Sequence, residues 1–159
     1  TVVIGTQTWF QRNLNYDVAG SKCNENSTAN CNEYGRLYNW RTAMVVCPSG
    51  WHLPSDAEWT VLVDFVGGTY TAGTKLKATS GWNFINEQGN GTDMYGFSAL
   101  PGAYGNPGGG FSTVGYGGCW WSATTEYSPH YWQMYAGVSV IDNLSLNQDH
   151  LMSVRCIQD

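Results

Sequence analysis

The sequence predicts an α+β domain with two helices, short antiparallel strands and long glycine-rich loops. Two stretches carry this prediction: residues 55–66 combine a helix-start signal with one apolar face, and the last third consists of short apolar and aromatic runs separated by turn residues. The composition agrees, because 20 glycines and 14% aromatic residues suit short strands and ordered loops better than a helical bundle. We expect residues 1–159 to form one domain of a longer exported protein.

The N-terminal part is predicted to contain one hairpin and one helix. Residues 2–4 and 8–10 flank a Gly-Thr turn and are expected to pair, whereas the asparagine-rich sequence through residue 32 is expected to be mostly loop. Leu37, Trp40 and Met44 share one helical face, which predicts the first helix within residues 36–46.

The densest local signal lies in residues 47–59. Pro48 and Pro54 remove two backbone donors, so the segment between them is not helical. Ser55 then begins the second helix, because its hydroxyl can accept from the Glu58 amide while the Glu58 carboxylate reaches back to the Ser55 amide. The apolar face of this helix consists of Trp59, Leu62, Val63 and Val66.

The C-terminal third is predicted to form four antiparallel strands, within 119–123, 131–136, 138–141 and 152–157. The glycine-rich residues 96–118 are interpreted as turns between strands, because neither the dinucleotide nor the P-loop glycine pattern is present. Residues 139–149 alternate apolar and polar side chains in a way that is typical of a loop or a sheet edge. The core is expected to contain Trp9, Trp40, Trp59, Trp120 and Trp121.

Charge and hydropathy exclude two classes of partner. The net charge is -5 and the seven Lys and Arg residues are scattered, which argues against nucleic acid and against an anionic membrane surface. No apolar run approaches the roughly 20 residues that a membrane-spanning helix needs. We therefore expect no direct membrane insertion.

The five cysteines favour disulfides, because none of them has the CxxC spacing of a zinc site or a redox motif. Cys23 and Cys31 flank a polar loop and can close a small ring, while a Cys47 to Cys156 bridge would close about 110 residues. Cys119 would remain as a buried thiol. Disulfides indicate an exported protein, at the cell surface or outside the cell.

Seven short motifs follow one another along the chain, at 5–9, 34–40, 47–59, 75–77, 96–102, 120–122 and 153–156. Together they resemble the Fibrobacter succinogenes major paralogous domain family of exported bacterial proteins. The resemblance implies a C-type-lectin-like fold, similar also to the formylglycine-generating sulfatase-modifying factors, with both termini in neighbouring strands. By position, Cys47 and Cys156 match the core disulfide of C-type lectins. The resemblance implies no defined activity.

One departure from the family pattern bears on function. The family commonly has a Lys and then a Gly before the Ser-Val-Arg-Cys motif, where this chain has residues 147–152. Divergence there is expected of a variable surface, and some C-type-lectin-like proteins of bacteria and phages carry segments diversified by retroelements for ligand display. The resemblance therefore suggests a hypervariable receptor-binding protein or an adhesin.

Residues 126–150 form the predicted ligand-binding surface of a non-catalytic domain. Rigid aromatic side chains alternate there with short polar ones, a mixture that paratopes use and that also suits stacking on sugar rings. The expected ligand is a carbohydrate or a protein on a cell surface. The residues expected to contact it are Tyr127, His130, Tyr131, Trp132, Gln133, Tyr135, Asp142, Asn143, Asn147, Asp149 and His150.

No cofactor or metal is expected. Asp142, Asn143, Asn147 and Asp149 carry oxygens that suit calcium, but their spacing matches no EF-hand loop and the tripeptides of lectin calcium sites are missing, so a solvated loop is favoured. The three histidines show no zinc-ligand spacing, and His52 is interpreted as a packing residue.

Catalysis has little support in the sequence. Asp56 and Glu58 are explained by helix capping, no nucleophile elbow is present, and the one thiol left over, Cys119, precedes two bulky tryptophans. Two other functions stay open: an oxidase related to the sulfatase-modifying factors, and a structural module of a surface or fimbrial protein.

Overall fold

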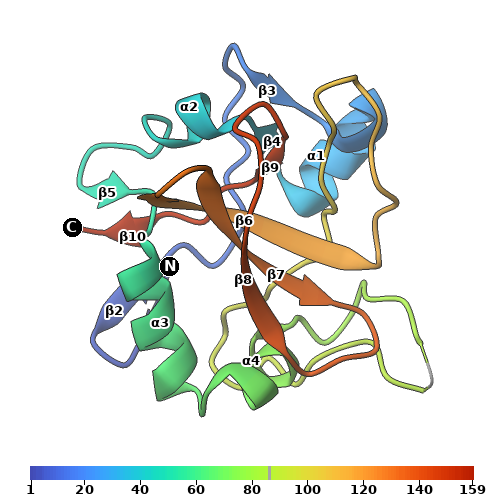
Figure 1. Ribbon diagram of the computed structural model, residues 1–159. Coiled ribbons are helices and arrows are strands. Elements are labelled where there is room, and N and C mark those ends of the chain that lie inside the picture. Colours follow the sequence, from blue (N-terminus) through green and yellow to red (C-terminus); the bar gives the residue numbers. More distant parts are fainter. Residues whose placement is uncertain (86) are drawn as a thin grey trace.

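The computed structural model describes residues 1–85 and 87–159 and is an α+β fold built from two sheets of short strands, with helices at their edges and ends (Figure 1). The helices are η1 (Asn24–Asn26, a 3-10 helix), α1 (Thr28–Tyr34), α2 (Trp40–Ala43), α3 (Asp56–Phe65) and α4 (Thr69–Leu76). The strands are β1 (Val2–Ile4), β2 (Gln7–Trp9), β3 (Ser21–Lys22), β4 (Leu37–Tyr38), β5 (Trp51–His52), β6 (Gly117–Thr125), β7 (Pro129–Tyr135), β8 (Ile141–Ser145), β9 (Met152–Ser153) and β10 (Ile157–Gln158).

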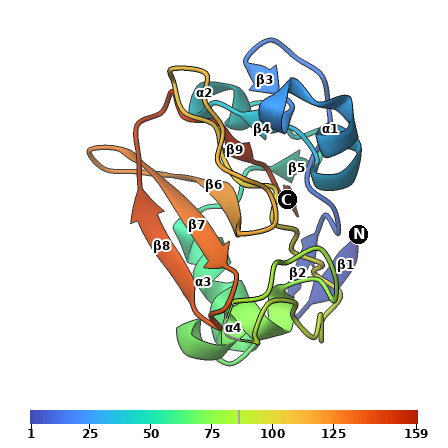
Figure 2. The same ribbon diagram turned by 90° about the vertical axis from the view of Figure 1, so that its right-hand side faces the viewer.

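The small sheet joins the two ends of the chain. Its strand order is β1-β2-β10-β5, with Ile157 opposite both Trp9 and His52. Both labelled termini lie on this side of the molecule in Figure 2. The expected pairing of the first hairpin and the neighbourhood of the termini are confirmed.

The large sheet has the order β3-β4-β9-β6-β7-β8. Its three long strands, β6 to β8, form an antiparallel meander, and β9 pairs with β6 in parallel. The predicted last strand is therefore divided between two sheets: β9 belongs to the large one and β10 to the small one. The predicted strand at 138–141 is displaced, because the structure begins β8 at Ile141 and continues it to Ser145.

The helix predicted at Ser55 is confirmed in detail. Ser55 caps α3 with a complete capping box, in which the Glu58 Oε2 accepts from the Ser55 amide at 2.7 Å. Trp59 of this helix is fully buried, with its ring centroid 5.0 Å from that of Trp9 and 5.9 Å from that of Trp132. Trp120 and Trp9 are also fully buried in this core.

The helix predicted within residues 36–46 is wrong for its first part. Leu37 and Tyr38 form β4 between β3 and β9, and only Trp40–Ala43 is helical, with Asn39 as its N-cap. Both β4 side chains are buried. Pairing with β3 on one side and β9 on the other gives the backbone N–H and C=O groups of β4 their hydrogen-bond partners. Met44, assigned to the apolar face, is 42% exposed. Pairing between distant segments outweighed the local helical period here.

Two helices lie where no helix was predicted. Ser27 caps α1 inside the polar stretch that was expected to be loop, and Gly68, at φ +87°, begins α4 directly after α3 ends. Burial of the apolar side of α4 against the sheet stabilises it, since Ala72 and Leu76 are fully buried. Local sequence contains little of this information, because α1 has few apolar residues of its own.

Both predicted disulfides, Cys23–Cys31 and Cys47–Cys156, are present, and Cys119 is a buried free thiol. Cys47 follows α2 and Cys156 lies between β9 and β10. The long bridge therefore ties the two halves of the chain together where the two sheets meet. Among the helices of residues 1–85 and 87–159, none has the length and apolar character of a membrane span.

A fully buried arginine connects three loops. The Arg155 Nη2 donates to the Asn13 Oδ1 at 2.8 Å, and its Nη1 donates to the backbone oxygens of Phe10 and Phe97. The guanidinium lies 4.4 Å from the centroid of the Phe97 ring. The Asn13 Oδ1 also accepts from the Trp120 indole at 2.8 Å, so β6 is joined to the same centre.

Substitution of Arg155 by Lys is expected to lower the free energy of unfolding by about 3 kcal/mol, because one ammonium cannot reach the partners of the guanidinium fork and leaves buried acceptors unpaired. Urea unfolding followed by tryptophan fluorescence measures the change. The matched control is Arg12→Lys at an exposed position, which should unfold like the parent. Equal loss in both variants would contradict the role assigned to Arg155.

The two disulfides should differ in their contribution to stability. Replacing both Cys47 and Cys156 by serine opens a loop of sequence separation 109 and should cost about 4.7 kcal/mol, whereas replacing Cys23 and Cys31 opens one of 8 and should cost about 2.6 kcal/mol. Denaturant unfolding of the two double variants tests the order. A larger loss for the short loop would show that chain entropy does not govern the effect.

Candidate functional site

Strand β7 has one buried side and one accessible side. Trp132 and Met134 point into the core, at 6% and 0% exposure, while Tyr131, Gln133 and Tyr135 alternate with them and stay accessible. We call these three residues the β7 outer row. Because directly paired residues share a face of the sheet, Leu144 lies beside Tyr131, and Asp142 lies beside Gln133.

The β7 outer row runs between two hollows. The first, which we call the glycine-loop hollow, has a volume of about 270 Å³, and the second, the turn hollow, about 240 Å³. The glycine-loop hollow is lined by Tyr104, Ser112, Thr113, Tyr116, Gln133 and Tyr135, among others. The turn hollow is lined by Trp40, Thr125, Tyr127, Ser128, Pro129, Asn147 and Gln148. Residues 129–135 span about 20 Å of strand, so the two hollows and the row form one elongated surface.

Tyr131 occupies the middle of this surface. Its ring packs edge-on against that of Trp121, with centroids 6.3 Å apart. Burial, together with smaller contributions from the neighbouring Cys119, Tyr104 and Asp142, raises the pKa of the phenol to about 12. Tyr131 is therefore a neutral hydrogen-bond donor and acceptor at physiological pH.

Sequence reasoning missed the tyrosines of the glycine-rich loop. Tyr104 and Tyr116 come from residues 96–118, which were assigned only to turns, yet both line the glycine-loop hollow. His150 lies beside Tyr104, with ring centroids 6.4 Å apart. The signal was present, because the mixture of aromatic and short polar side chains that marked residues 126–150 also occurs at 104–116.

Trp132, predicted to contact a ligand, does not belong to this surface. Its ring stacks on Trp59 and its indole Nε1 donates to the Asp56 Oδ1 at 3.0 Å. His130 also turns toward helix α3, with its Nδ1 2.6 Å from the Asp56 Oδ2, and Asn143 lies on the same side as Trp132 because the two are paired. Because successive side chains of a strand point to opposite faces of the sheet, these three residues lie on the other face from the β7 outer row.

Asp56 fastens the first turn of α3 to the meander. Its amide donates to the Thr124 hydroxyl at 2.9 Å. Burial alone would raise the pKa of its carboxyl, but hydrogen bonds from Ser122, His130, Asn143 and Trp132 outweigh burial and lower it. Asp56 is thus charged and fully engaged in holding β6, β7 and β8 in place.

Lys77 holds the turn between β7 and β8. It is 2% exposed, and its Nζ donates to the backbone oxygens of Tyr135 at 2.9 Å and Val138 at 2.7 Å. The Nζ also lies 5.0 Å from the centroid of the Trp82 ring. Burial lowers the pKa of this ammonium to about 8. The end of the β7 outer row is therefore positioned by a buried cation.

The remaining predicted residues lie around the turn hollow. Tyr127 is fully exposed in the β6–β7 turn, and Tyr127 and Asn147 both line the hollow. Asp149 is exposed beyond Asn147. Among the described residues, no group of three His, Cys, Asp or Glu side chains is placed to hold a metal ion.

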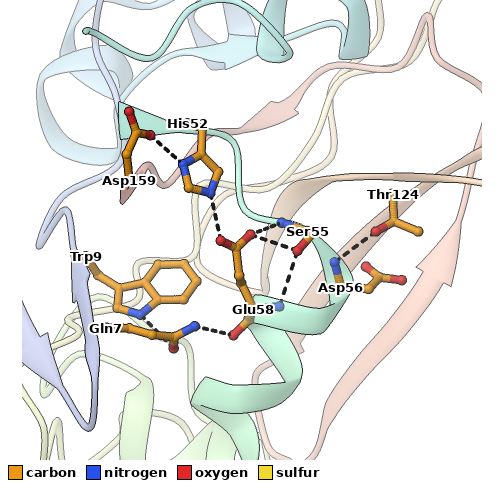
Figure 3. Close-up of polar contacts among 8 residues, drawn as sticks. All are labelled: Gln7, Trp9, His52, Ser55, Asp56, Glu58, Thr124 and Asp159. Carbon is orange, nitrogen blue, oxygen red and sulfur yellow. Dashed lines mark hydrogen bonds and ion pairs between the residues drawn. The ribbon is translucent and has the colours of Figure 1, made fainter. Parts of the chain in front are cut away.

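A second polar cluster surrounds His52, which sequence analysis had assigned to packing. Figure 3 shows its imidazole between two carboxylates: Nδ1 lies 2.8 Å from the Asp159 Oδ1 and Nε2 lies 2.7 Å from the Glu58 Oε1. Burial would lower the pKa of His52, but the hydrogen bonds with Asp159 and Glu58 outweigh it and raise the pKa. Because both ring nitrogens are occupied, the cluster clamps β5, α3 and the end of β10 together.

The free thiol offers no reactive centre. Cys119 is 3% exposed, and burial raises its pKa to about 12. A thiol in this state is not ionised at physiological pH, and the thiolate is the form that reacts with oxidants and metals.

The comparisons with known proteins give one match. A family model described as the Fibrobacter succinogenes major domain matches residues 2–158. No curated protein and no solved structure matches the chain.

The raised pKa of His52 predicts a pH-dependent stability. A group whose pKa is raised in the folded state stabilises the fold below its unfolded pKa, near 6.5, and loses this contribution as the pH rises through the folded value. Because the side chain is 40% exposed, we expect a loss of at most about 1 kcal/mol between about pH 6 and about pH 8.

Denaturant unfolding at the two pH values tests this, with two variants. His52→Gln should abolish most of the difference, whereas His150→Gln should keep it, because the His150 Nδ1 bonds to the backbone oxygen of Asn147 and no described carboxylate pairs with this ring. An unchanged pH dependence in His52→Gln would contradict the assignment.

Proposed function

The chain belongs to the Fibrobacter succinogenes major domain family, and on this premise we propose that it is a non-catalytic, extracellular ligand-binding domain. The observation that carries the proposal is the β7 outer row with a hollow at each end. Regular strands position these side chains, and the other side of β7 is anchored in the core by Trp132 and Met134. A ligand therefore meets a surface that is already formed, which reduces the entropy lost on binding.

The chemistry of the surface supports binding. Tyrosines supply a large contact area and lose few rotamers, and their hydroxyls add hydrogen bonds. Gln133, Asp142 and Ser112 provide further donors and acceptors along the same surface. This combination suits either a carbohydrate, whose rings stack on aromatic faces, or a protein on a cell surface.

The proposed location is the cell surface or the extracellular space. The two disulfides support it, because such bonds form and persist in oxidising compartments. We also propose that residues 126–150 vary among related receptor-binding proteins or adhesins. Residues from both the start and the end of this segment line the turn hollow. The exposed side chains of this segment, such as Tyr127, Asn147 and Asp149, can change without disturbing the core, to which Trp132 and Met134 of the same segment belong.

The other candidate functions receive less support. An oxidase related to the sulfatase-modifying factors would need a reactive thiol, and Cys119 is buried with a raised pKa. A purely structural module would not require an accessible row of tyrosines beside two hollows.

Two exposed tyrosines test the proposal. Tyr135→Ala alters the glycine-loop hollow and Tyr127→Ala alters the turn hollow, and each should weaken binding by about tenfold if the residue lies at the centre of the contact. The control is Tyr70→Ala, an exposed tyrosine on α4, which packs on the opposite face of the sheet. Glycan arrays and whole-cell binding measure the effect and separate a carbohydrate from a protein ligand. Equal binding by all three variants and the parent would refute the proposal.

A further inference from the structure

Strand β8 is the outer edge of the large sheet. It is last in the strand order, and Figure 2 shows it at the side of the molecule, with β7 as its one neighbour in the sheet. Asp142, Asn143, Leu144 and Ser145 are all exposed, and only Ile141 is buried. Among the described edge strands, β8 is the longest with five residues, compared with three in β1 and two each in β3 and β5.

The hydrogen-bond phase shows which backbone groups of β8 face outward. The Leu146 amide donates to the Pro129 oxygen at 3.0 Å, and alternate residues of an antiparallel strand bond to the same neighbour, so Asp142 and Leu144 also bond to β7. The bonds of β7 to its other neighbour agree with this assignment. The Ala136 amide donates to the Tyr116 oxygen at 2.7 Å, so the even-numbered residues of β7 bond to β6 and the odd-numbered ones bond to β8. Asn143 and Ser145 must therefore direct their N–H and C=O groups away from the sheet.

Nothing in the described structure covers these outward groups. Helix α4 lies against the start of β8, where the Gly73 amide donates to the Ser139 oxygen at 2.8 Å. Outside the strand ladders, no backbone hydrogen bond of the described residues uses the N–H or C=O group of Asn143 or Ser145. Proline, lysine and a bulge, which protect many sheet edges, are missing from β8, and its register with β7 is continuous. Asp142 is the one charged residue of this strand. The edge thus offers two donors and two acceptors to an incoming strand.

We propose that an extended segment of a basic partner polypeptide adds to the sheet alongside β8. The inference rests on the proposed ligand-binding function and names a partner class for it. Backbone pairing with Asn143 and Ser145 supplies affinity, and side chains opposite β8 supply selectivity. The partner residues opposite Asp142 and Leu144 then lie on the face of the β7 outer row.

Charge indicates which side chains the partner carries. Asp142 is exposed and forms no ion pair with any described residue, and the whole chain has a net charge of -5. A Lys or Arg opposite Asp142 and an apolar residue opposite Leu144, which is 44% exposed, are the complementary choice. A second copy of this chain fits less well, since it has the same negative charge.

The probe is a library of random linear peptides displayed on phage and selected on the whole chain, and the best peptide is then synthesised. Ser145→Pro removes an outward amide that the fold does not use, at an edge position where proline is tolerated. The matched control Ser145→Thr changes the side chain and keeps the amide. We expect about a tenfold loss of affinity in the first variant and little change in the second. Bound peptide should also slow hydrogen exchange of the Asn143 and Ser145 amides.

Asp142→Lys is the second variant. It reverses the charge opposite the basic side chain of the peptide, so it should abolish binding of that peptide, and it serves as the test if Ser145→Pro fails to fold. Three results would each overturn the inference: selection of no peptide, equal binding by the proline or lysine variant and the parent, or a dimer of this chain that Ser145→Pro dissociates. If cells or glycans still bind through Tyr127 and Tyr135 while the β8 variants have no effect, the proposed function stands and only the edge-pairing inference fails.

Discussion

The buried guanidinium of Arg155 is the constraint on which the rest of the structure depends. No carboxylate among the described residues forms an ion pair with it, so its desolvation is offset by backbone oxygens and by the Asn13 side chain. Those partners belong to the N-terminal loop and the glycine-rich loop, neither of which has regular structure at these points. Satisfying one cation therefore fixes two irregular segments, and Asn13 extends the network to Trp120 in the middle of the large sheet.

The position of Arg155 explains how the two sheets are joined. It lies between β9 and β10, beside Cys156, where the chain leaves the large sheet and enters the small one. The disulfide holds the same crossing from the side of α2. Because this crossing is held both by covalent and by polar contacts, the long meander β6 to β8 rests on a rigid base. On the outer face of the meander, Cys119 and Trp121 of β6 are buried in a second core cluster, and the accessible β7 outer row beside them is the part that we propose for a ligand.

About half of the candidate surface could be predicted from sequence. Tyr127, Tyr131, Gln133 and Tyr135 keep accessible surface in the structure, and composition alone marks their segment. Their contact with a ligand stays a prediction. Trp132 was assigned to this surface wrongly, because every second side chain of β7 points into the core. Which alternate residues point inward depends on the face of the sheet that packs against α3, and the sequence does not reveal that face. The contribution of the glycine-rich loop could not be placed, as its approach to β7 is a contact between segments distant in sequence.

The sequence by itself determined the elements whose signals are local: the capped helix α3, the N-terminal hairpin, the strand-rich last third and the family. A capping box or a tight turn is complete within a few residues, so neighbours in sequence suffice to specify it. Only the tertiary structure decided that Leu37 and Tyr38 are a strand, that the last strand is divided between two sheets, and that β8 is an open edge. These outcomes depend on hydrogen bonds and burial between segments far apart in the chain, which no local pattern encodes.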